Sequence, residues 1–383
     1  MPTISLSEIL TKTEHVAQEV AAPEVPTVDG EGRWPEAGLR ALQAAGLGGL
    51  VVPEDQGGLG HGLLTLARVC ESLGQRCAST AICFGMHGVA SAVLAAKATP
   101  SQRREFLEPI VQGRHLTTLA LSEPGTGAHF YLPETRLRKV EGGFQVSGRK
   151  SFVTNGAHAD SYVVSTTASA QGAGPGDFSC VVVPAGTEGL EWGPPWRGVG
   201  MRGNSARTLE LRNVHLPPGN LLGQEGDEIW YVFHVVSPYF LVAMAGTYLG
   251  IAISAVEEVR KHLSERRYTH TGSPLGQQTL LQHRLGTLWA MVERTRLLIH
   301  DAASKGDSAH PQALLALCSA KAEVADCVVS VVNEALTLVG GRGYSEEGAS
   351  SVARIIRDLH SARIMLGNER LTGLIAQQVL MER

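Results

Sequence analysis

The chain has 383 residues, with 33 Lys and Arg against 37 Asp and Glu, so its formal net charge at pH 7 is −4. A slightly acidic chain lacks the strongly basic character that nucleic acids attract, and 43% hydrophobic residues suffice for a full core. We therefore expect a globular protein of two or three domains with no nucleic-acid partner.

The six cysteines contain no CxxC pair, and most of them lie in apolar helical patterns. This favours buried thiols in a reducing compartment and argues against a metal site. The N-terminal residues lack a basic stretch followed by an apolar run, and no segment approaches the roughly 20 uninterrupted apolar residues of a membrane span. We expect a cytoplasmic protein without membrane association or metal, with reduced thiols at Cys70, Cys77, Cys83, Cys180, Cys318 and Cys327.

Residues 1–117 have a helical pattern and are expected to form an N-terminal domain of about five helices. Apolar residues recur at helical spacing from Ser5 onward and again after Trp34. Two strongly apolar helices are expected at 63–77 and 81–96, and Ser101 is the expected N-cap of the helix that follows.

The pattern changes at His115, because residues 118–226 alternate apolar and polar side chains and are divided by clusters of Gly and Pro. Alternation with a period of two is typical of half-buried strands. We predict a small antiparallel β-barrel or β-sandwich for this middle domain.

Long helical patterns return in residues 227–383, and they predict a C-terminal bundle of four to five antiparallel helices. The expected helices cover 228–266, 276–304, 311–339, 348–363 and 369–381. The predicted fold class is therefore α+β and multidomain, with a helical domain, a β domain and a helical bundle in that order. No GxGxxG strand-turn-helix signature is present, which excludes the usual dinucleotide-binding fold as the organising unit.

Four stretches carry motifs in the right order and spacing to be read together. They are LALSEPGTGAHF (119–130), GRKSFVTNGAHAD (148–160), MRGNSARTLELRNVHLPPGNLLG (201–223), and LVGGRGYSEEG with RDLHSAR (338–363). They resemble four segments of the acyl-CoA dehydrogenase family, among them its TEPGAGSD, G-K-x-W-I-T-N-G and GGxGY…RDAR motifs. The resemblance covers nearly the whole chain and implies that family's three-domain fold and an FAD-dependent oxidoreductase acting on CH–CH groups.

The resemblance also implies a flavin site on the middle domain. An isoalloxazine ring needs a flat apolar wall and hydrogen-bond donors at its N5 and carbonyl edges. Phe152 and Thr154 place an aromatic face and a hydroxyl close together on one strand. By the resemblance Thr154 meets N5, Ser122 meets the pyrimidine edge, and Gly367 and Asn368 border the ring.

For the pyrophosphate of the cofactor, the resemblance points to Arg266, whose counterpart reaches the FAD of a neighbouring subunit. His283 stands where many members have Gln and keeps a donor, and Gly340 and Gly341 let backbone amides approach phosphate closely. Cofactor contacts shared between subunits imply a homo-oligomer, either a homodimer or a homotetramer. The family also implies an electron-transfer flavoprotein as a candidate electron acceptor.

The proton acceptor of the family's reaction is missing from both of its usual places. The Glu that precedes the Gly of Y-E-G-T corresponds to Leu366, and the second place, used by some members, falls near Phe240. The Ser of GSD, which helps to hold coenzyme A, corresponds to Ala128. The catalytic base is therefore unassigned, with His129 and Glu369 as the remaining candidates.

Three functions remain open. The first is an FAD-dependent dehydrogenase that acts on an acyl thioester or a related small molecule with a relocated base. The second is a flavin-dependent monooxygenase or hydroxylase on the same fold, which needs no α-proton acceptor. The third is a non-catalytic subunit of a hetero-oligomeric acyl-CoA dehydrogenase, since the flavin motifs are kept and the base is lost.

Overall fold

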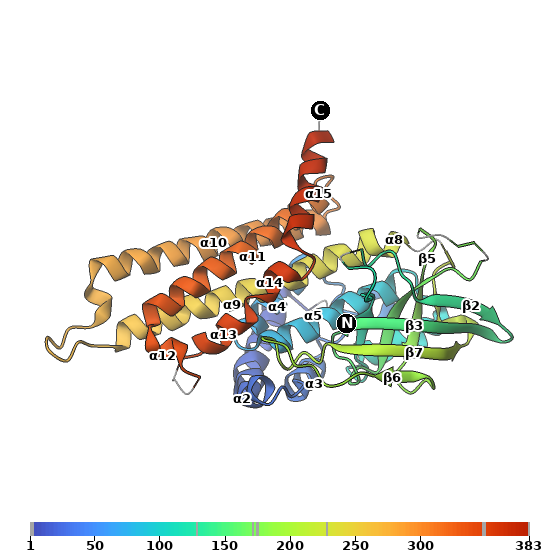
Figure 1. Ribbon diagram of the computed structural model, residues 1–383, viewed down its shortest axis with the longest axis horizontal. Helices are drawn as coiled ribbons and strands as arrows, with labels where there is room; N and C mark the ends of the chain where they lie inside the picture. Colours follow the sequence, from blue (N-terminus) through green and yellow to red (C-terminus); the bar gives the residue numbers. More distant parts are fainter. Residues whose placement is uncertain are drawn as a thin grey trace.

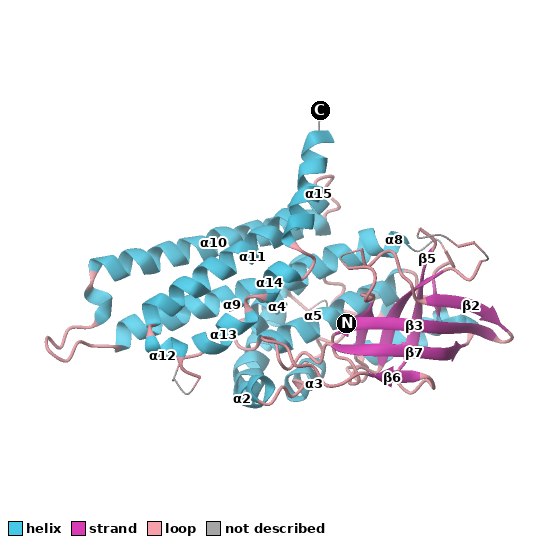
Figure 2. Cartoon of the chain, in the orientation of Figure 1, coloured by secondary structure: helices cyan, strands magenta, loops and turns pink. Residues whose placement is uncertain are grey.

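The computed structural model describes residues 4–127, 129–170, 172–173, 176–226, 229–346 and 350–381. Helices come first, two β-sheets follow, and long helices end the chain, so the predicted α+β order is confirmed. Figure 1 shows the sheets at one end of an elongated molecule, and Figure 2 shows helices making up the rest of its length. The domain boundaries expected after residues 117 and 226 stay predictions.

The N-terminal part is helical, and its first helix begins with a capping box in which Ser5 and Glu8 exchange side-chain and backbone hydrogen bonds. Ser101 is not the N-cap of the later helix, because Thr99 caps it, with Pro100 and Gln102 in its first turn. The helices are α1 (Leu6–Val16), α2 (Ala22–Gly30), α3 (Glu36–Ala44), α4 (Leu63–Gly74), α5 (Ala78–Ala96), α6 (Pro100–Gln102) and α7 (Glu108–Val111).

The middle part has two four-stranded sheets, with strand orders β1-β4-β5-β8 and β2-β3-β7-β6. The strand pairs are antiparallel except that β1 runs parallel to β4, because the chain crosses to the second sheet and back between them. The strands are β1 (Thr117–Ala120), β2 (Arg136–Val140), β3 (Gly143–Val153), β4 (Ser161–Thr167), β5 (Phe178–Pro184), β6 (Leu190–Trp192), β7 (Arg207–Leu216) and β8 (Leu221–Leu222).

The C-terminal part contains three long helices and several short ones. They are α8 (Ile229–Tyr231), α9 (Ser237–Glu265), α10 (Thr279–Asp307), α11 (Ala313–Val339), α12 (Gly341–Tyr344), α13 (Val352–Asp358), α14 (Ser361–Ile364) and α15 (Asn368–Met381). The single helix expected at 348–363 is wrong, because the chain breaks between α13 and α14. There the hydroxyl of Ser361 donates to the O of Asp358 at 2.8 Å, a local bond that competes with the helical ladder.

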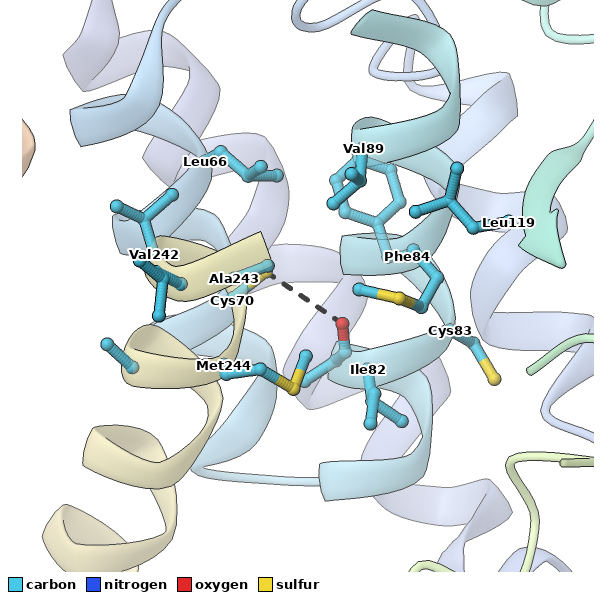
Figure 3. Close-up of a cluster of buried hydrophobic side chains, with 14 of the residues drawn as sticks. Leu66, Cys70, Ile82, Cys83, Phe84, Val89, Leu119, Val242, Ala243 and Met244 are labelled. Atoms are coloured by element: carbon cyan, nitrogen blue, oxygen red, sulfur yellow. Dashed lines mark hydrogen bonds between the residues drawn. The ribbon is translucent and has the colours of Figure 1, made fainter. Parts of the chain in front are cut away.

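One core joins the two helical parts. Figure 3 shows side chains of α4, α5 and α9 pointing into a shared cluster, with Leu119 of β1 at its edge. The thiol of Cys70 lies in this cluster and donates to the O of Ala81 at 3.8 Å. All six cysteines are buried, and none of them is in a disulfide bond.

Two apolar helical segments pass the length and hydropathy test for a membrane span. They are Ala78–Ala96 and Ile229–Glu265, and 100% and 78% of their most apolar windows are buried inside the protein. Their apolar side chains therefore form the core shared by the helical domains.

A buried ion pair connects strands of the β domain next to Ser122 and Phe152, two residues of the predicted flavin site. The ammonium of Lys150 on β3 donates to the carboxylate of Glu123, which follows β1, and both side chains are almost completely buried (0% and 1% exposed). Lys150 also donates to the O of Ser165 at 2.7 Å, and Glu123 accepts the hydroxyl of Thr135 at 2.7 Å. The pair thus connects the ends of β1 and β3 with β2 and β4.

Burial acts on the two charges in different ways. It lowers the pKa of Lys150 to about 8. Burial alone raises the pKa of Glu123, but the charge of Lys150 and hydrogen bonds from Lys150, Thr135 and the N–H of Glu134 outweigh it, so the pKa of Glu123 is lowered overall. The carboxylate therefore stays ionised and depends on its partners.

His87 on α5 joins the helical domain to the first strand. Its Nε2–H donates to the O of Gly48 at 2.9 Å, and its Nδ1 accepts the N–H of Thr117 at 3.1 Å. Both bonds need the neutral ring protonated on Nε2. Burial lowers the pKa of His87 to about 4, which keeps the ring neutral at physiological pH.

We expect the Lys150→Met variant to lose about 3 to 5 kcal/mol of unfolding free energy, because the carboxylate of Glu123 then stays buried without its partner. Urea denaturation followed by circular dichroism measures this loss. Arg149→Met is the matched control, since the Arg149–Glu210 pair is 57% and 36% exposed and such pairs contribute under about 1 kcal/mol. Equal losses in the two variants would contradict the role given to Lys150.

His87 predicts a loss of stability in acid. Its folded pKa lies below the ordinary value of about 6.5, so the unfolded chain takes up the proton first as the pH falls. Its contribution is complete above about pH 6.5 and is lost as the pH falls toward 4, by up to about 3 kcal/mol. Unfolding free energies at pH 7 and 4.5 should differ less in His87→Met than in the wild type. His310→Met, at an exposed histidine, is the control and should show the same difference in unfolding free energy between pH 7 and 4.5 as the wild type. If His87→Met also shows the full wild-type difference, His87 is not the source of the acid sensitivity.

Candidate functional site

The end of β3 carries an exposed aromatic ring. Phe152 is 67% exposed, and the irregular register between Lys150 and Val153 turns it away from the core. Phe152, Asn155 and Ala157 have φ of 55°, 60° and 65°, a strained region for residues other than glycine. Strain of this kind clusters at functional sites, so the end of β3 is a candidate site on backbone geometry alone.

Two hydroxyls stand near this ring in the sheet. Thr154 is 8% exposed and lies two residues beyond Phe152, and Ser122 is half-buried after β1. The N–H of Ser151 donates to the O of Ser122 at 2.8 Å and so brings the two segments together. Within the described part of the chain, neither hydroxyl has a hydrogen-bond partner. An aromatic wall with unpaired hydroxyls beside it fits the needs of an isoalloxazine ring.

Asn155 anchors this strand end to the N-terminal domain. Its Oδ1 accepts the indole N–H of Trp34 at 2.9 Å, and its Nδ2 donates to the O of Cys83 at 2.9 Å. Trp34 in turn stacks on His158, with ring centroids 4.6 Å apart and planes 3° apart. The position of Thr154 is therefore determined by contacts from two domains.

The turn between α14 and α15 is the second part of the site. Leu366 and Gly367 have φ of 62° and 43°, so two successive residues are left-handed. Leu366 is half-buried and packs against the core. A Cβ added at Gly367 would meet no atom within 4 Å, so there is open space beside this turn. Asn368 donates from Nδ2 to the O of Ala322 at 3.2 Å, which joins the turn to α11.

The other predicted cofactor residues lie at the opposite end of the molecule. Arg266 follows α9 and His283 is in the first turns of α10, and both are exposed. Gly340 has a φ of 67°, and neither Gly340 nor Gly341 would place a Cβ within 4 Å of another atom. The 29 residues of α9 span about 43 Å at about 1.5 Å per residue, and Figure 1 shows α12 far from β3. One chain therefore does not bring the two groups together around one cofactor.

Neither of the two places to which the family resemblance assigns the catalytic base carries a carboxylate. Leu366 is apolar, and Phe240 is half-buried in a stretch of α9 whose first acidic residue is Glu257. Glu369 is exposed in the first turn of α15, and His129 is exposed on the loop after β1. Ala128 lies outside the described residues.

His129 and α15 meet at one tyrosine. The ring of His129 lies 5.9 Å from that of Tyr131, in an edge-to-face arrangement. Arg370, next to Glu369 in sequence, donates to the hydroxyl of Tyr131 at 2.8 Å and also lies over its ring. The two candidate bases are thus on elements that face each other across Tyr131. Among the described residues no group of three His, Cys, Asp or Glu side chains is placed to hold a metal ion.

Sequence reasoning missed three residues that position these parts, namely Lys150, Asn155 and Lys321. Lys150 and Asn155 lie inside a recognised motif, but a motif does not state which side chain is buried. Lys321 is a single cation within the apolar pattern ALLALCSAKAEVADCVV. A charge on the apolar face of a helix is the signal that points to a specific buried contact.

Three parts of the chain match the models of three domains of one family. They are "Acyl-CoA dehydrogenase, N-terminal domain" over residues 5–114, "Acyl-CoA dehydrogenase, middle domain" over 118–214, and "Acyl-CoA dehydrogenase, C-terminal domain" over 241–380. Together the matches follow the order of helical domain, β domain and helical bundle.

Whole-length relatives agree with this match. The chain is 29% identical over 375 residues to cyclohex-1-ene-1-carbonyl-CoA dehydrogenase of Geobacter metallireducens, covering 97% of each chain. It is 27% identical to the mitochondrial isobutyryl-CoA dehydrogenase of Dictyostelium discoideum, covering 99% of this chain and 91% of the relative. The solved structure of butyryl-CoA dehydrogenase from Megasphaera elsdenii superposes with a TM-score of 0.91 at 26% identity, covering 98% of each chain. This protein belongs to the acyl-CoA dehydrogenase family and is an FAD-dependent oxidoreductase of that type.

Proposed function

We propose that the protein oxidises an acyl thioester at the site between the end of β3 and the turn before α15, with a proton acceptor at a position other than residue 366. The observation that carries the proposal is the exposed Phe152 ring beside the unpaired hydroxyls of Ser122 and Thr154. The relatives named for isobutyryl-CoA and cyclohexene-carbonyl-CoA support the substrate class.

Five residues of one subunit would hold the isoalloxazine ring. Phe152 supplies an apolar wall, Ser122 and Thr154 supply hydroxyl donors, and the turn at Gly367 and Asn368 borders the ring. When bound, FAD supplies the two-electron acceptor of the reaction. The role of the chain is to orient substrate and cofactor and to exclude water.

A second subunit would complete the cofactor site. Arg266 and His283 present donors, and the open backbone at Gly340 and Gly341 allows close approach of a pyrophosphate. About 43 Å along α9 separates this group from the β domain, so it would serve the FAD of a neighbouring copy. A homodimer or homotetramer is the assembly that meets this need.

The electron acceptor and the compartment belong to the same proposal. An electron-transfer flavoprotein would take the electrons from the reduced enzyme, as the family resemblance implies. Six buried cysteines without a disulfide bond support a reducing compartment such as the cytoplasm.

The proposed proton acceptor is either His129 or Glu369, which lie on elements that face each other across Tyr131. His129 has an imidazole, the side chain that most often serves as a general acid or base, and Glu369 has a carboxylate one residue before Arg370. Both side chains are exposed at the junction of the β domain and α15. A base has to lie within hydrogen-bond reach of the substrate carbon, so only substrate-bound measurements separate the two.

Anaerobic addition of isobutyryl-CoA to the FAD-loaded protein tests the proposal. Bleaching of the flavin absorption is the expected result, and its loss in His129→Ala or Glu369→Gln identifies the base. If neither a CoA thioester nor an acyl-carrier thioester bleaches the flavin, the dehydrogenase proposal fails. Oxygen incorporation into product with supplied reductant would then favour a monooxygenase, and a chain that binds FAD only with a paralogue would favour a non-catalytic subunit.

We expect Thr154→Val to weaken FAD binding about fivefold and Phe152→Ala about tenfold, because each removes one contact worth about 1 kcal/mol or more. Fluorescence titration of the apoprotein with FAD measures both constants. Thr11→Val is the control, since Thr11 is an exposed residue of α1 whose hydroxyl bonds only to the O of Ser7. Unchanged FAD affinity in both site variants would place the flavin elsewhere.

Leu366→Glu restores a carboxylate at the usual base position. We expect it to raise the rate of anaerobic flavin bleaching by isobutyryl-CoA by about tenfold or more over the wild type, because a positioned general base contributes about 100- to 10,000-fold when its geometry is good. Leu366→Gln has nearly the same shape and no basic group, and should show no increase. Equal rates in the Glu and Gln variants, both with FAD bound, would mean that the turn does not face the α carbon.

A further inference from the structure

A buried lysine stands behind the turn that carries Leu366. Lys321 on α11 is 0% exposed, and its ammonium donates to the O of Ala362 at 2.8 Å and to the Oδ1 of Asn368 at 3.2 Å. No ion pair of Lys321 is found within the described residues, and the carboxylate of Asp326 acts on it only from a longer distance. Burial lowers the pKa of Lys321 to about 8.

Such a residue is costly to keep. Removing an ammonium from water costs several kcal/mol unless charge and hydrogen bonds compensate, and here the hydrogen bonds go to neutral oxygens while the Asp326 carboxylate gives only longer-range compensation. An apolar side chain would suit the surrounding α11 face, which consists of residues such as Leu317, Val324 and Ala325. The cost therefore points to a specific task for the ammonium.

The two acceptors bracket the strained turn. Ala362 lies in α14 before the turn, and Asn368 opens α15 after it. Between them, Leu366 and Gly367 hold left-handed φ angles in succession. Asn368 completes the clamp by donating to the O of Ala322, the residue after Lys321.

A second contact holds the other side of the same segment. The hydroxyl of Tyr248 on α9 lies 3.0 Å from the Oγ of Ser361 and 3.3 Å from the Sδ of Met365. Tyr248 is completely buried. The segment between α14 and α15 is thus held from α11 by Lys321 and from α9 by Tyr248, which leaves it little freedom to move.

We propose that Lys321 is a positioning residue, whose ammonium locks the turn at Leu366, Gly367 and Asn368 in the conformation that borders the flavin. This inference rests on the proposed function, since it assumes that FAD lies beside this turn. Lys321 acts through the turn and does not touch the cofactor. If the turn moved by about 1 Å, its atoms would no longer lie in contact with the flavin ring.

The test compares variants of the whole protein by FAD affinity, by the shape of the visible flavin spectrum and by thermal unfolding of the apoprotein. Lys321→Met keeps the length of the side chain and removes its charge and donors. We expect FAD binding to weaken about tenfold with a changed flavin spectrum, while the unfolding midpoint of the apoprotein does not fall, because the buried charge is gone. Lys305→Met is the control, as Lys305 lies on α10 and pairs only with Asp301, one turn away.

Two further variants decide the case if Lys321→Met does not fold. Lys321→Gln leaves a polar side chain whose amide ends about one bond short of both acceptors, whereas Lys321→Arg keeps the charge and the donors. We expect FAD binding to weaken about tenfold in Lys321→Gln and to be weakened less in Lys321→Arg.

Unchanged FAD affinity and spectrum in Lys321→Met, or in Lys321→Gln where Lys321→Met does not fold, would overturn the inference and leave the proposed function standing. A wild-type protein that takes up no FAD would overturn the proposed function, and the positioning role with it.

Discussion

The buried pair of Lys150 and Glu123 is the contact on which the flavin site depends. Glu123 directly follows Ser122, and Lys150 comes two residues before Phe152, so the pair fixes the separation of the two segments that would hold the ring. Its carboxylate also accepts hydrogen bonds from the start of β2, and its ammonium reaches β4. A buried ion pair adds little net stability compared with apolar residues, but it enforces one register, because any slip leaves a charge without its partner.

Positioning groups surround the candidate flavin site. Asn155, Lys150 and Lys321 each satisfy several buried hydrogen bonds and hold the strand end or the turn in strained conformations. Leu366 of the same turn is apolar and half-buried, and the family resemblance assigns the catalytic carboxylate to its position. These two observations are the reason for proposing a proton acceptor elsewhere on a scaffold that keeps the flavin geometry.

The order and type of the elements followed from sequence pattern, because long apolar periodicities and alternating strands report burial directly. The exact start of α6 and the division of the helix expected at 348–363 could not be predicted from the sequence pattern. Thr99 rather than Ser101 caps α6, and the hydroxyl of Ser361 divides one expected helix into two. At both boundaries a hydroxyl side chain bonds to a nearby backbone group, a local contact that periodicity does not reveal. The parallel pairing of β1 and β4 also escaped prediction, since strand direction depends on how the chain crosses between sheets.

The sequence by itself determined the family and the three-part order, because motifs and periodicity are properties of the chain read in order. It also predicts, by the family resemblance, that Leu366 stands at the place of the usual carboxylate. Only the tertiary structure showed that Phe152 is exposed beside two unpaired hydroxyls, that Arg266 follows a helix about 43 Å long, and that Lys321 reaches both sides of one turn. These are relations between residues far apart in the chain. They depend on which helix packs against which, and a linear pattern does not contain that information.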